Sequence, residues 1–299
     1  MLRLNQAVSL SFLAVLALVL AGCGDGKKTE LLVKTGASGK TGDAGAAKAG
    51  DGSLERVKKA EVLKWGADPS GGAPFVYFDD KDTSKIIGFE MDIMEKLATH
   101  AGYKSEMSKG DWDNLPDLLL AKRVDVIVNG YEITEERKNA VSFSEPYYVY
   151  EQQLTVRAED KDKYKSLDDL KGKKVGTLKN AEANNVLKEA GWIKDLIMEH
   201  PDSQSPYEDL ILKRTDAVLQ ESIIAEFYAG KDQKLYNIPK TFSSGQYGVM
   251  VRLEDKALLD NVNRILRVMK ENGELAAIYK KWGIWTERQK EIGIKEGAK

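Results

Sequence analysis

Cysteine and histidine are almost absent from this 299-residue sequence, which contains one cysteine and two histidines. The single cysteine, Cys23, cannot close a disulfide within the chain, so the fold must be stable without such cross-links. His100 and His200 form no zinc-binding helix motif, and the sequence has no nucleophile elbow and no phosphate-binding loop. We therefore expect no metal, no cofactor and no catalytic residues.

A surplus of positive charge and long apolar runs are missing as well. The 45 Lys and Arg residues are offset by 47 Asp and Glu residues, which gives a formal net charge of −2. This balance, with no long basic run, argues against binding of nucleic acid by bulk electrostatic attraction. The apolar stretch at residues 8–20 is shorter than a transmembrane helix requires, and no second stretch is longer. The remainder has the composition of a soluble globular protein, which we expect to be a monomer.

The N-terminus has the features of a targeting segment followed by a linker. Arg3 precedes the apolar stretch, which ends in Leu-Ala-Gly-Cys and resembles a bacterial lipobox, whose cysteine is acylated and becomes the mature N-terminus. An ordinary secretory signal cleaved nearby is the alternative. We expect a lipoprotein signal peptide at residues 1–23, lipidation of Cys23, and an extracytoplasmic protein anchored to a membrane, in the periplasm or at the outer face of the cell membrane. Residues 24–53 are expected to form a flexible tether that spans roughly 30 Å.

Residues 124–148 contain the most informative pattern of the sequence. The β-branched run at residues 124–128 predicts a strand buried on both faces, and the Asn-Gly pair at residues 129–130 predicts a turn after it. Thr134 is suited to cap the helix that follows, and Arg137 lies about one turn into that helix. A strand, a glycine turn and a helix start form the kind of crevice in which α/β proteins hold ligands. By itself, Arg137 is most simply a solvated arginine on a helix.

The same stretch resembles the signature of the family 3 extracellular solute-binding proteins, the receptors of polar amino acid ABC importers. That signature runs strand, Gly, small hydroxyl residue, Thr-x-x-Arg and then Phe-Ser-x-Pro-Tyr. The resemblance covers residues 60–285 and implies an α/β, two-lobe fold of the type II periplasmic-binding-protein class with a two-strand hinge. The matching residues are Gly130, Thr134, Arg137, Phe143, Ser144, Pro146, Tyr147 and Tyr148.

The resemblance also predicts where the lobes begin and end. The chain would cross between them near residues 148–152 and 244–247, and such receptors close around the ligand by hinge bending. The expected segments are the first lobe at residues 54–149 and 247–285, the second lobe at residues 150–246, and a charged C-terminal tail at residues 286–299.

In the first lobe, the resemblance implies that an acid and aromatic side chains contact the ligand. Asp68 matches the ligand-facing acid of the first loop, although an aspartate before proline also forms turns. Trp112 matches an aromatic residue that stacks on the ligand, and a tryptophan packed in the core is the alternative. The aromatic residue expected in the first loop is replaced by Gly72, so Phe75 or Tyr77 would have to supply that wall.

In the second lobe, the resemblance implies one site for the ligand carboxylate and one for its ammonium. Asn180 and Ala181 stand where the family has Gly-Thr or Ser-Thr; the hydroxyl is absent, but backbone N–H groups at a helix start can still hold a carboxylate. Glu221 stands where an aspartate usually binds the ammonium, and a surface glutamate at a helix start is the alternative. The resemblance also places Gly130 and Tyr131 beside the ligand.

The candidate pocket brings one cation, Arg137, together with three carboxylates, Asp68, Glu132 and Glu221. Arg137 can hold a ligand carboxylate through a planar two-point contact, and Glu221 can hold its ammonium. Glu132 occupies the position of the family's small hydroxyl residue, and buried carboxylates without partners are costly. We therefore predict a basic amino acid such as lysine, arginine or ornithine, with Trp112 stacking on its second cation.

Other interpretations remain open at this point. Glu132 could pair with Arg137 or with Lys179, in which case the pocket is less acidic or the ligand is not an amino acid. The predicted function is a lipid-anchored binding protein that delivers its solute to an ABC permease in the membrane. An enzyme on the same scaffold, similar to the cyclohexadienyl dehydratases and with Glu132 or Glu221 as general acid, is the alternative, as is a ligand-sensing module.

Overall fold

The computed structural model describes residues 50–297 of the chain. The predicted signal peptide, Cys23 and most of the predicted tether lie outside the described residues. Within residues 50–297, no helix is both long enough and apolar enough to cross a membrane.

The first lobe is built on a five-stranded sheet in the order β4-β1-β5-β13-β6. β1 pairs in parallel with β4 and β5, whereas β13 runs antiparallel to β5 and β6. The loops that follow β1 and β5 therefore meet at one edge, where the backbone N–H of Asp68 donates to Oδ1 of Asn129 at 2.7 Å. The strands are β1 (Val62–Ala67), β4 (Lys104–Lys109), β5 (Val126–Ile127), β6 (Val141–Phe143) and β13 (Met250–Arg252), and a separate hairpin is formed by β2 (Tyr77–Asp79) and β3 (Asp82–Ile87).

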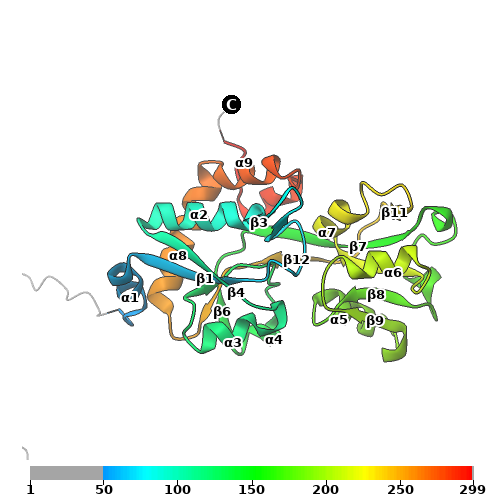
Figure 1. Ribbon diagram of the computed structural model, residues 1–299, viewed down its shortest axis with the longest axis horizontal. Coiled ribbons are helices and arrows are strands. Elements are labelled where there is room, and N and C mark those ends of the chain that lie inside the picture. Colours follow the sequence, from blue (N-terminus) through cyan, green and yellow to red (C-terminus); the bar gives the residue numbers. More distant parts are fainter. Residues whose placement is uncertain (1–49, 298–299) are drawn as a thin grey trace, which may run out of the picture. The chain divides into compact units, whose positions relative to one another are not determined.

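The helices of the first lobe follow the apolar spacing of the sequence. Ile93 of α2, Leu266 of α8 and Tyr279 of α9 are buried in one apolar cluster, and Leu115 and Leu119 of α3 are buried in another. Figure 1 shows α2 and α9 on the opposite side of the sheet from α3. α8 contacts both α2 and α9. The elements are α1 (Ser53–Ala60), α2 (Phe89–Ala101), the 3-10 helix η1 (Trp112–Asn114), α3 (Leu115–Leu120), α4 (Glu135–Lys138), α8 (Lys256–Glu271) and α9 (Glu274–Lys281).

The second lobe is built on a six-stranded sheet with the order β11-β7-β10-β8-β9, to which β12 is added through β7. β8 pairs in parallel with β9 and β10, so their carboxyl ends also share one edge. The strands are β7 (Tyr148–Arg157), β8 (Val175–Leu178), β9 (Ile197–His200), β10 (Ala217–Glu221), β11 (Leu235–Asn237) and β12 (Ser244–Tyr247). The helices are α5 (Glu182–Glu189), α6 (Ser205–Ile211), α7 (Ser222–Tyr228) and the 3-10 helices η2 (Ala158–Asp160), η3 (Asp168–Leu170) and η4 (Lys194–Leu196).

Two strands connect the lobes. The first part of β7, from Tyr148 to Glu151, pairs with β12, and its continuation from Gln152 to Thr155 pairs with β10 of the second sheet. β7 and β12 therefore pass between the lobes side by side, as Figure 1 shows. The predicted α/β fold of two lobes with a two-strand hinge is confirmed.

The segment predicted as a charged C-terminal tail is packed against the hinge. It forms the 3-10 helix η5 (Glu287–Ile292), in which the side chain of Gln289 is fully buried. The Gln289 amide accepts a hydrogen bond from the N–H of Val149 and donates one to its C=O, both at 2.9 Å. Ile294 is also buried in the first-lobe core. The charged composition of the segment gave no indication that Gln289 and Ile294 are buried.

Gln289→Ala is expected to lower the free energy of unfolding by about 1–3 kcal/mol, because it leaves two buried backbone groups of Val149 without partners. The measurement is urea denaturation followed by far-UV circular dichroism. Lys290→Ala, which changes an exposed neighbour, provides the control. Equal stability of the two variants would show that the amide contributes nothing to the fold.

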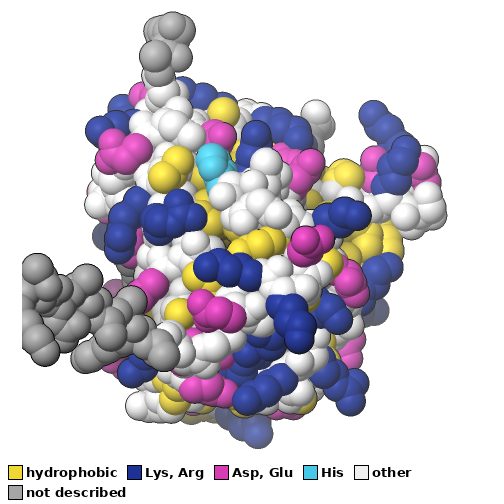
Figure 2. All heavy atoms as spheres, turned by 90° about the vertical axis from the view of Figure 1, so that its left-hand side faces the viewer, with side chains coloured by type: hydrophobic (Ala, Val, Ile, Leu, Met, Phe, Trp, Pro, Cys, Tyr) yellow, Lys and Arg dark blue, Asp and Glu magenta, His cyan; other side chains and the backbone are white. Residues whose placement is uncertain are grey.

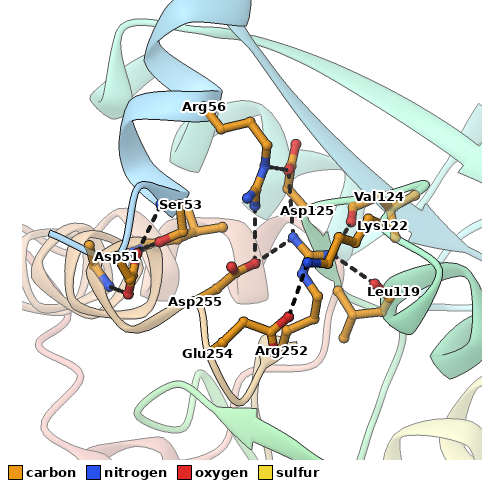
Figure 3. A network of polar contacts seen from close by, with 12 residues as sticks. Asp51, Ser53, Arg56, Leu119, Lys122, Val124, Asp125, Arg252, Glu254 and Asp255 are labelled. Carbon is orange, nitrogen blue, oxygen red and sulfur yellow. Dashed lines mark hydrogen bonds and ion pairs between the residues drawn. The ribbon is translucent and has the colours of Figure 1, made fainter.

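A buried ionic network holds the start of the folded body (Figure 3). The side chain of Arg252, only 1% exposed, donates to the carbonyl oxygens of Leu119 at 2.7 Å and Val124 at 2.6 Å, and it pairs with Asp255. Arg56 of α1 reaches Asp255 at 3.0 Å. The network thus joins α1 to the strand ends of the first sheet.

The folded body begins earlier than predicted. Asp51 accepts hydrogen bonds from the backbone N–H groups of Ser53 and Ala257, both at 2.9 Å. Ser53 is buried and starts α1, which the sequence analysis did not foresee. The predicted tether, which was expected to continue to residue 53, is therefore corrected: residues 51–53 belong to the folded body.

Charges of both signs are interspersed on the surface of the first lobe. Figure 2 shows Lys and Arg side chains next to Asp and Glu side chains over the whole visible face, with only small apolar areas between them. This face therefore carries no large field of one sign.

Candidate ligand-binding site

A small cavity lies between the two lobes, where the loops after β1, β5, β8 and β10 meet. Its volume is about 30 Å³, enough for roughly two water molecules. We call it the inner cavity. It is lined from the first lobe by Gly71, Gly72, Phe75, Trp112, Asn129, Gly130 and Glu132, and from the second lobe by Leu178, Pro201, Ser203, Glu221 and Ile224.

A larger hollow of about 480 Å³ adjoins the inner cavity and shares Trp112, Leu178 and Pro201 with it. Most of its lining residues are exposed, and we call it the outer hollow. Its charged residues are four aspartates and one lysine: Asp68, Asp111, Asp113, Asp202 and Lys179.

The lobes contact each other directly around these spaces. Asp113 of the first lobe receives hydrogen bonds from Lys179 at 3.1 Å and from the side chain of Asn180 at 3.0 Å. The carbonyl oxygen of Gly71 accepts from the N–H of Ser203 at 3.0 Å. Gly72 has φ of 117°, and a Cβ atom there would lie 2.8 Å from the Tyr228 hydroxyl oxygen. The aromatic residue of the family pattern therefore has no room at position 72.

Arg137 and Glu132 form an ion pair in this interface. The helix start of α4 sets the position of Arg137, since Oγ1 of Thr134 accepts its N–H at 3.3 Å as predicted. Nη1 of Arg137 pairs with the Glu132 carboxylate and donates to the Glu132 carbonyl at 3.0 Å, and Nη2 donates to the Asn180 carbonyl at 3.1 Å. The guanidinium also lies 5.3 Å from the centre of the Trp112 ring.

The second oxygen of Glu132 is held by the other lobe. It accepts the backbone N–H of Glu182, the first residue of α5, at 3.0 Å. The carboxylate, 1% exposed, is therefore bound by a guanidinium and by a backbone N–H at a helix start. This corrects the expectation that Glu132 lacks a partner, and of the two alternatives Arg137 is the partner, because Lys179 pairs with Asp113.

Glu221 at the end of β10 is buried, with 3% exposure, and lines the inner cavity. Its Oε2 atom has no hydrogen-bond partner among residues 50–297. Burial, and next the neighbouring Glu132 carboxylate, raise the pKa of the Glu221 carboxyl well above its ordinary value. A buried carboxylate becomes favourable when a cation is placed against it, so this side chain is suited to bind a positively charged group.

Asp68 has features of both interpretations given by the sequence, a turn-forming aspartate and an acid that faces the ligand. Its carboxylate accepts the N–H groups of Ser70 at 2.8 Å and Trp112 at 2.9 Å, as a turn-forming aspartate does. It also lines the outer hollow, and burial raises its pKa. The expectation that Asp68 lacks partners is corrected, because two backbone groups satisfy it.

Of the aromatic residues that the sequence analysis named, two line the inner cavity and two do not. Phe75 and Trp112 line the inner cavity, and Nε1 of Trp112 donates to the Asn129 carbonyl at 2.9 Å. The Tyr131 ring stacks on Trp112 at 4.7 Å between centres and lies behind it, away from the cavity lining. Tyr77 lines a separate hollow.

Gly130 and Ala181 shape the backbone of the site. Gly130 has φ of 62°, and a Cβ atom there would lie 2.8 Å from Phe75, so only glycine fits against that ring. Ala181 is the buried N-cap residue of α5 and contributes no side chain to the inner cavity.

The sequence analysis missed several residues of the site. Glu90 is fully buried, accepts the N–H of Gly130 at 2.8 Å and the Tyr147 hydroxyl, and burial raises its pKa to about 7. Asp113 and Ser203 connect the lobes. A local pattern gives no sign of these contacts, because each joins segments that are far apart in the sequence.

The sequence profile of the bacterial extracellular solute-binding proteins, family 3, matches residues 63–284 of the chain. The match covers most of the folded body and both lobes. The chain belongs to this family. Within residues 50–297, this family 3 protein contains no group of three or more His, Cys, Asp or Glu side chains that could hold a metal ion.

Curated relatives of this family 3 protein are amino acid-binding proteins. It is 32% identical over 235 residues to the L-cystine-binding protein TcyJ of Escherichia coli K12. The aligned region covers 78% of this chain and 87% of the relative. It is 31% identical over 237 residues to the arginine-binding extracellular protein ArtP of Bacillus subtilis, covering 76% and 88%.

Among solved structures, this solute-binding protein is similar to the ancestral amino acid-binding protein AncCDT-1, described as a precursor of cyclohexadienyl dehydratase. The TM-score is 0.69 at 28% identity, and the match covers 77% of this chain and 98% of that chain. The family's binding-protein architecture thus extends over both lobes.

Proposed function

We propose that this chain is a lipid-anchored, extracytoplasmic receptor that captures a small cationic solute, a basic amino acid or a related amine, and delivers it to an ABC importer. The observation that carries the proposal is Glu221: a buried carboxyl whose Oε2 atom has no hydrogen-bond partner among the described residues, facing a cavity between two hinged lobes. A cationic group placed in that cavity would give Glu221 the partner it lacks.

The charges around the cleft support a positive ligand. The inner cavity is lined by the acids Glu132 and Glu221, and Arg137, which does not line it, is already paired with Glu132, so Glu221 is left in excess. The outer hollow adds four aspartates against Lys179. A concave surface lined mainly by one sign of charge concentrates ions of the opposite sign and speeds their capture.

The hinge supports capture by lobe closure. Both chain crossings lie side by side in β7 and β12, and the hydrogen bonds across the cleft join loops at its rim. Opening at the hinge would break these contacts, together with those of Arg137 and Glu132 to the start of α5, and expose the inner cavity. Closing would enclose the ligand between the lobes.

Anchoring rests on the sequence. The Leu-Ala-Gly-Cys motif ending at Cys23 supports a lipidated N-terminus, and the Gly-, Ala- and Lys-rich composition of the residues that follow supports a tether between that anchor and the folded body. The arginine named for the Bacillus relative ArtP supports a basic ligand.

An enzyme is the second candidate, and one observation favours it. The raised pKa of Glu221 leaves a protonated carboxyl beside the inner cavity, which is what a general acid requires, and AncCDT-1 is described as a precursor of a dehydratase. The pairing of Arg137 with Glu132 argues against it, because an anionic prephenate-like substrate would find no free cation there.

A thermal-shift screen of the protein from Gly24 onward tests the proposal. A cationic ligand at about 100 times its dissociation constant adds roughly 2.7 kcal/mol of stability, which should raise Tm by about 5–10 °C for a body of this size. Glutamate and neutral amino acids should give no shift. A shift with neutral amino acids alone would reject the cationic ligand, and turnover of prephenate would move the protein to the enzyme class.

A further inference from the structure

The chain's own carboxylate occupies the place where a ligand carboxylate would be expected. The resemblance to the family implies that Arg137 and the backbone N–H groups at the start of α5 bind that carboxylate. In the structure these groups bind Glu132: Arg137 pairs with one oxygen, and the N–H of Glu182 donates to the other at 3.0 Å. The donors that an α-amino acid needs are thus already used.

Glu132 is fixed in this position by its surroundings. Its backbone forms a β-bridge with Tyr247 beside the hinge, and Nη1 of Arg137 also donates to its carbonyl at 3.0 Å. To free Arg137, an α-amino acid would have to leave a 1%-exposed carboxylate without its partners and next to the Glu221 carboxyl. Separating a buried charge from the one cation that pairs with it among residues 50–297 is strongly unfavourable.

The space that remains suits an ammonium group better than an amino acid. The inner cavity of about 30 Å³ lies against Glu221, whose Oε2 has no partner within residues 50–297. A carbon chain leaving this cavity would pass the shared wall of Trp112, Leu178 and Pro201 into the outer hollow. There the aspartates outnumber Lys179, so the net negative charge of the lining favours a second cation.

We propose that the solute is an organic amine without a carboxylate, and that Glu132 supplies, from within the protein, the carboxylate that an α-amino acid brings to this site. The ligand's ammonium binds Glu221, and a second amino or guanidino group lies in the outer hollow. This inference rests on the proposed receptor function and narrows its ligand class.

Matched pairs that differ only by the carboxylate test it. Calorimetric titrations of the protein from Gly24 onward would compare cadaverine with lysine, putrescine with ornithine, and agmatine with arginine. In each pair the amine is expected to bind roughly 10- to 100-fold more tightly, because the amino acid must break charge-assisted hydrogen bonds of Glu132 before it can bind.

A substitution should reverse the preference. Glu132→Thr restores the small hydroxyl of the family pattern and frees Arg137, so lysine, ornithine or arginine should now bind at least as tightly as its amine. Glu136→Thr is the matched control, since it removes one exposed carboxylate from α4, the helix that carries Arg137, and the preference of this variant should equal that of the unaltered protein.

The outcomes separate the two proposals. If the unaltered protein binds an amino acid as tightly as its amine or more tightly, the carboxylate-free ligand is rejected and the cationic receptor is kept. If neither member of any pair binds, the proposed cationic receptor fails as well. The comparison within each pair needs no variant, so it decides the question even if Glu132→Thr does not fold.

Discussion

Replacing Arg252 with methionine is expected to lower the free energy of unfolding by about 3 kcal/mol and Tm by about 6–12 °C. The guanidinium is the buried centre of the ionic network, where it satisfies the carbonyl oxygens of Leu119 and Val124 and pairs with Asp255. Methionine fills a similar volume but leaves both carbonyl groups and part of the charge on Asp255 without partners. Arg56 remains on Asp255 and limits the loss.

Urea denaturation followed by tryptophan fluorescence measures this effect. Arg264→Met, on an exposed position of α8, removes the same charge outside the network and should change stability by less than about 0.5 kcal/mol. A similar, small loss for both variants would mean that the network is replaceable by apolar packing, as some buried ion pairs are.

Replacing Glu221 with glutamine is expected to weaken binding of a cationic ligand roughly 10- to 100-fold, because one charge-assisted hydrogen bond in a dry site is lost. The same change should stabilise the ligand-free protein at neutral and higher pH, since folding then no longer requires a carboxyl to stay protonated above its ordinary pKa. Glu226→Gln, on the exposed face of α7, is the control and should alter neither property. Unchanged affinity in Glu221→Gln would remove Glu221 from the site.

The pH dependence has a defined sign. The pKa of Glu221 is raised in the folded protein, so the folded state binds more protons than the unfolded state above the ordinary glutamate value of about 4.3. Stability of the ligand-free protein is then fully present below that value and is lost as pH rises toward the raised pKa. Glu90, with a pKa raised to about 7, contributes with the same sign. Between pH 5 and 8, Glu221→Gln should therefore show a smaller decrease of Tm than the unaltered protein, with the contribution of Glu90 remaining.

Sequence patterns were sufficient where the determinants are local. The β-branched run before Asn129 became β5, Thr134 caps α4 as its chemistry requires, and the apolar spacing after residue 88 became α2. The hinge crossings followed from the family pattern, and their pairing is present in β7 and β12.

The sequence was insufficient where two distant segments decide the outcome together. Whether Glu132 pairs with Arg137 or Lys179 depends on how α5 approaches the first lobe, which brings Lys179 to Asp113 instead. The role of Gly72 depends on Tyr228, more than 150 residues later. Similarly, a single glutamine in a charged segment gives no indication that it will pair with the backbone of Val149.

The attachment of Gln289 to β7 determines which residues can bend. Val149 is held on both its N–H and C=O by the C-terminal segment, while Gln152 is already paired with Glu221 of the second sheet. Only Tyr150 and Glu151 lie between these two anchored positions. Rotation of one lobe against the other in β7 must therefore be concentrated in about four backbone torsions. By restraining Val149, η5 thus determines where β7 can bend and sets the axis of opening.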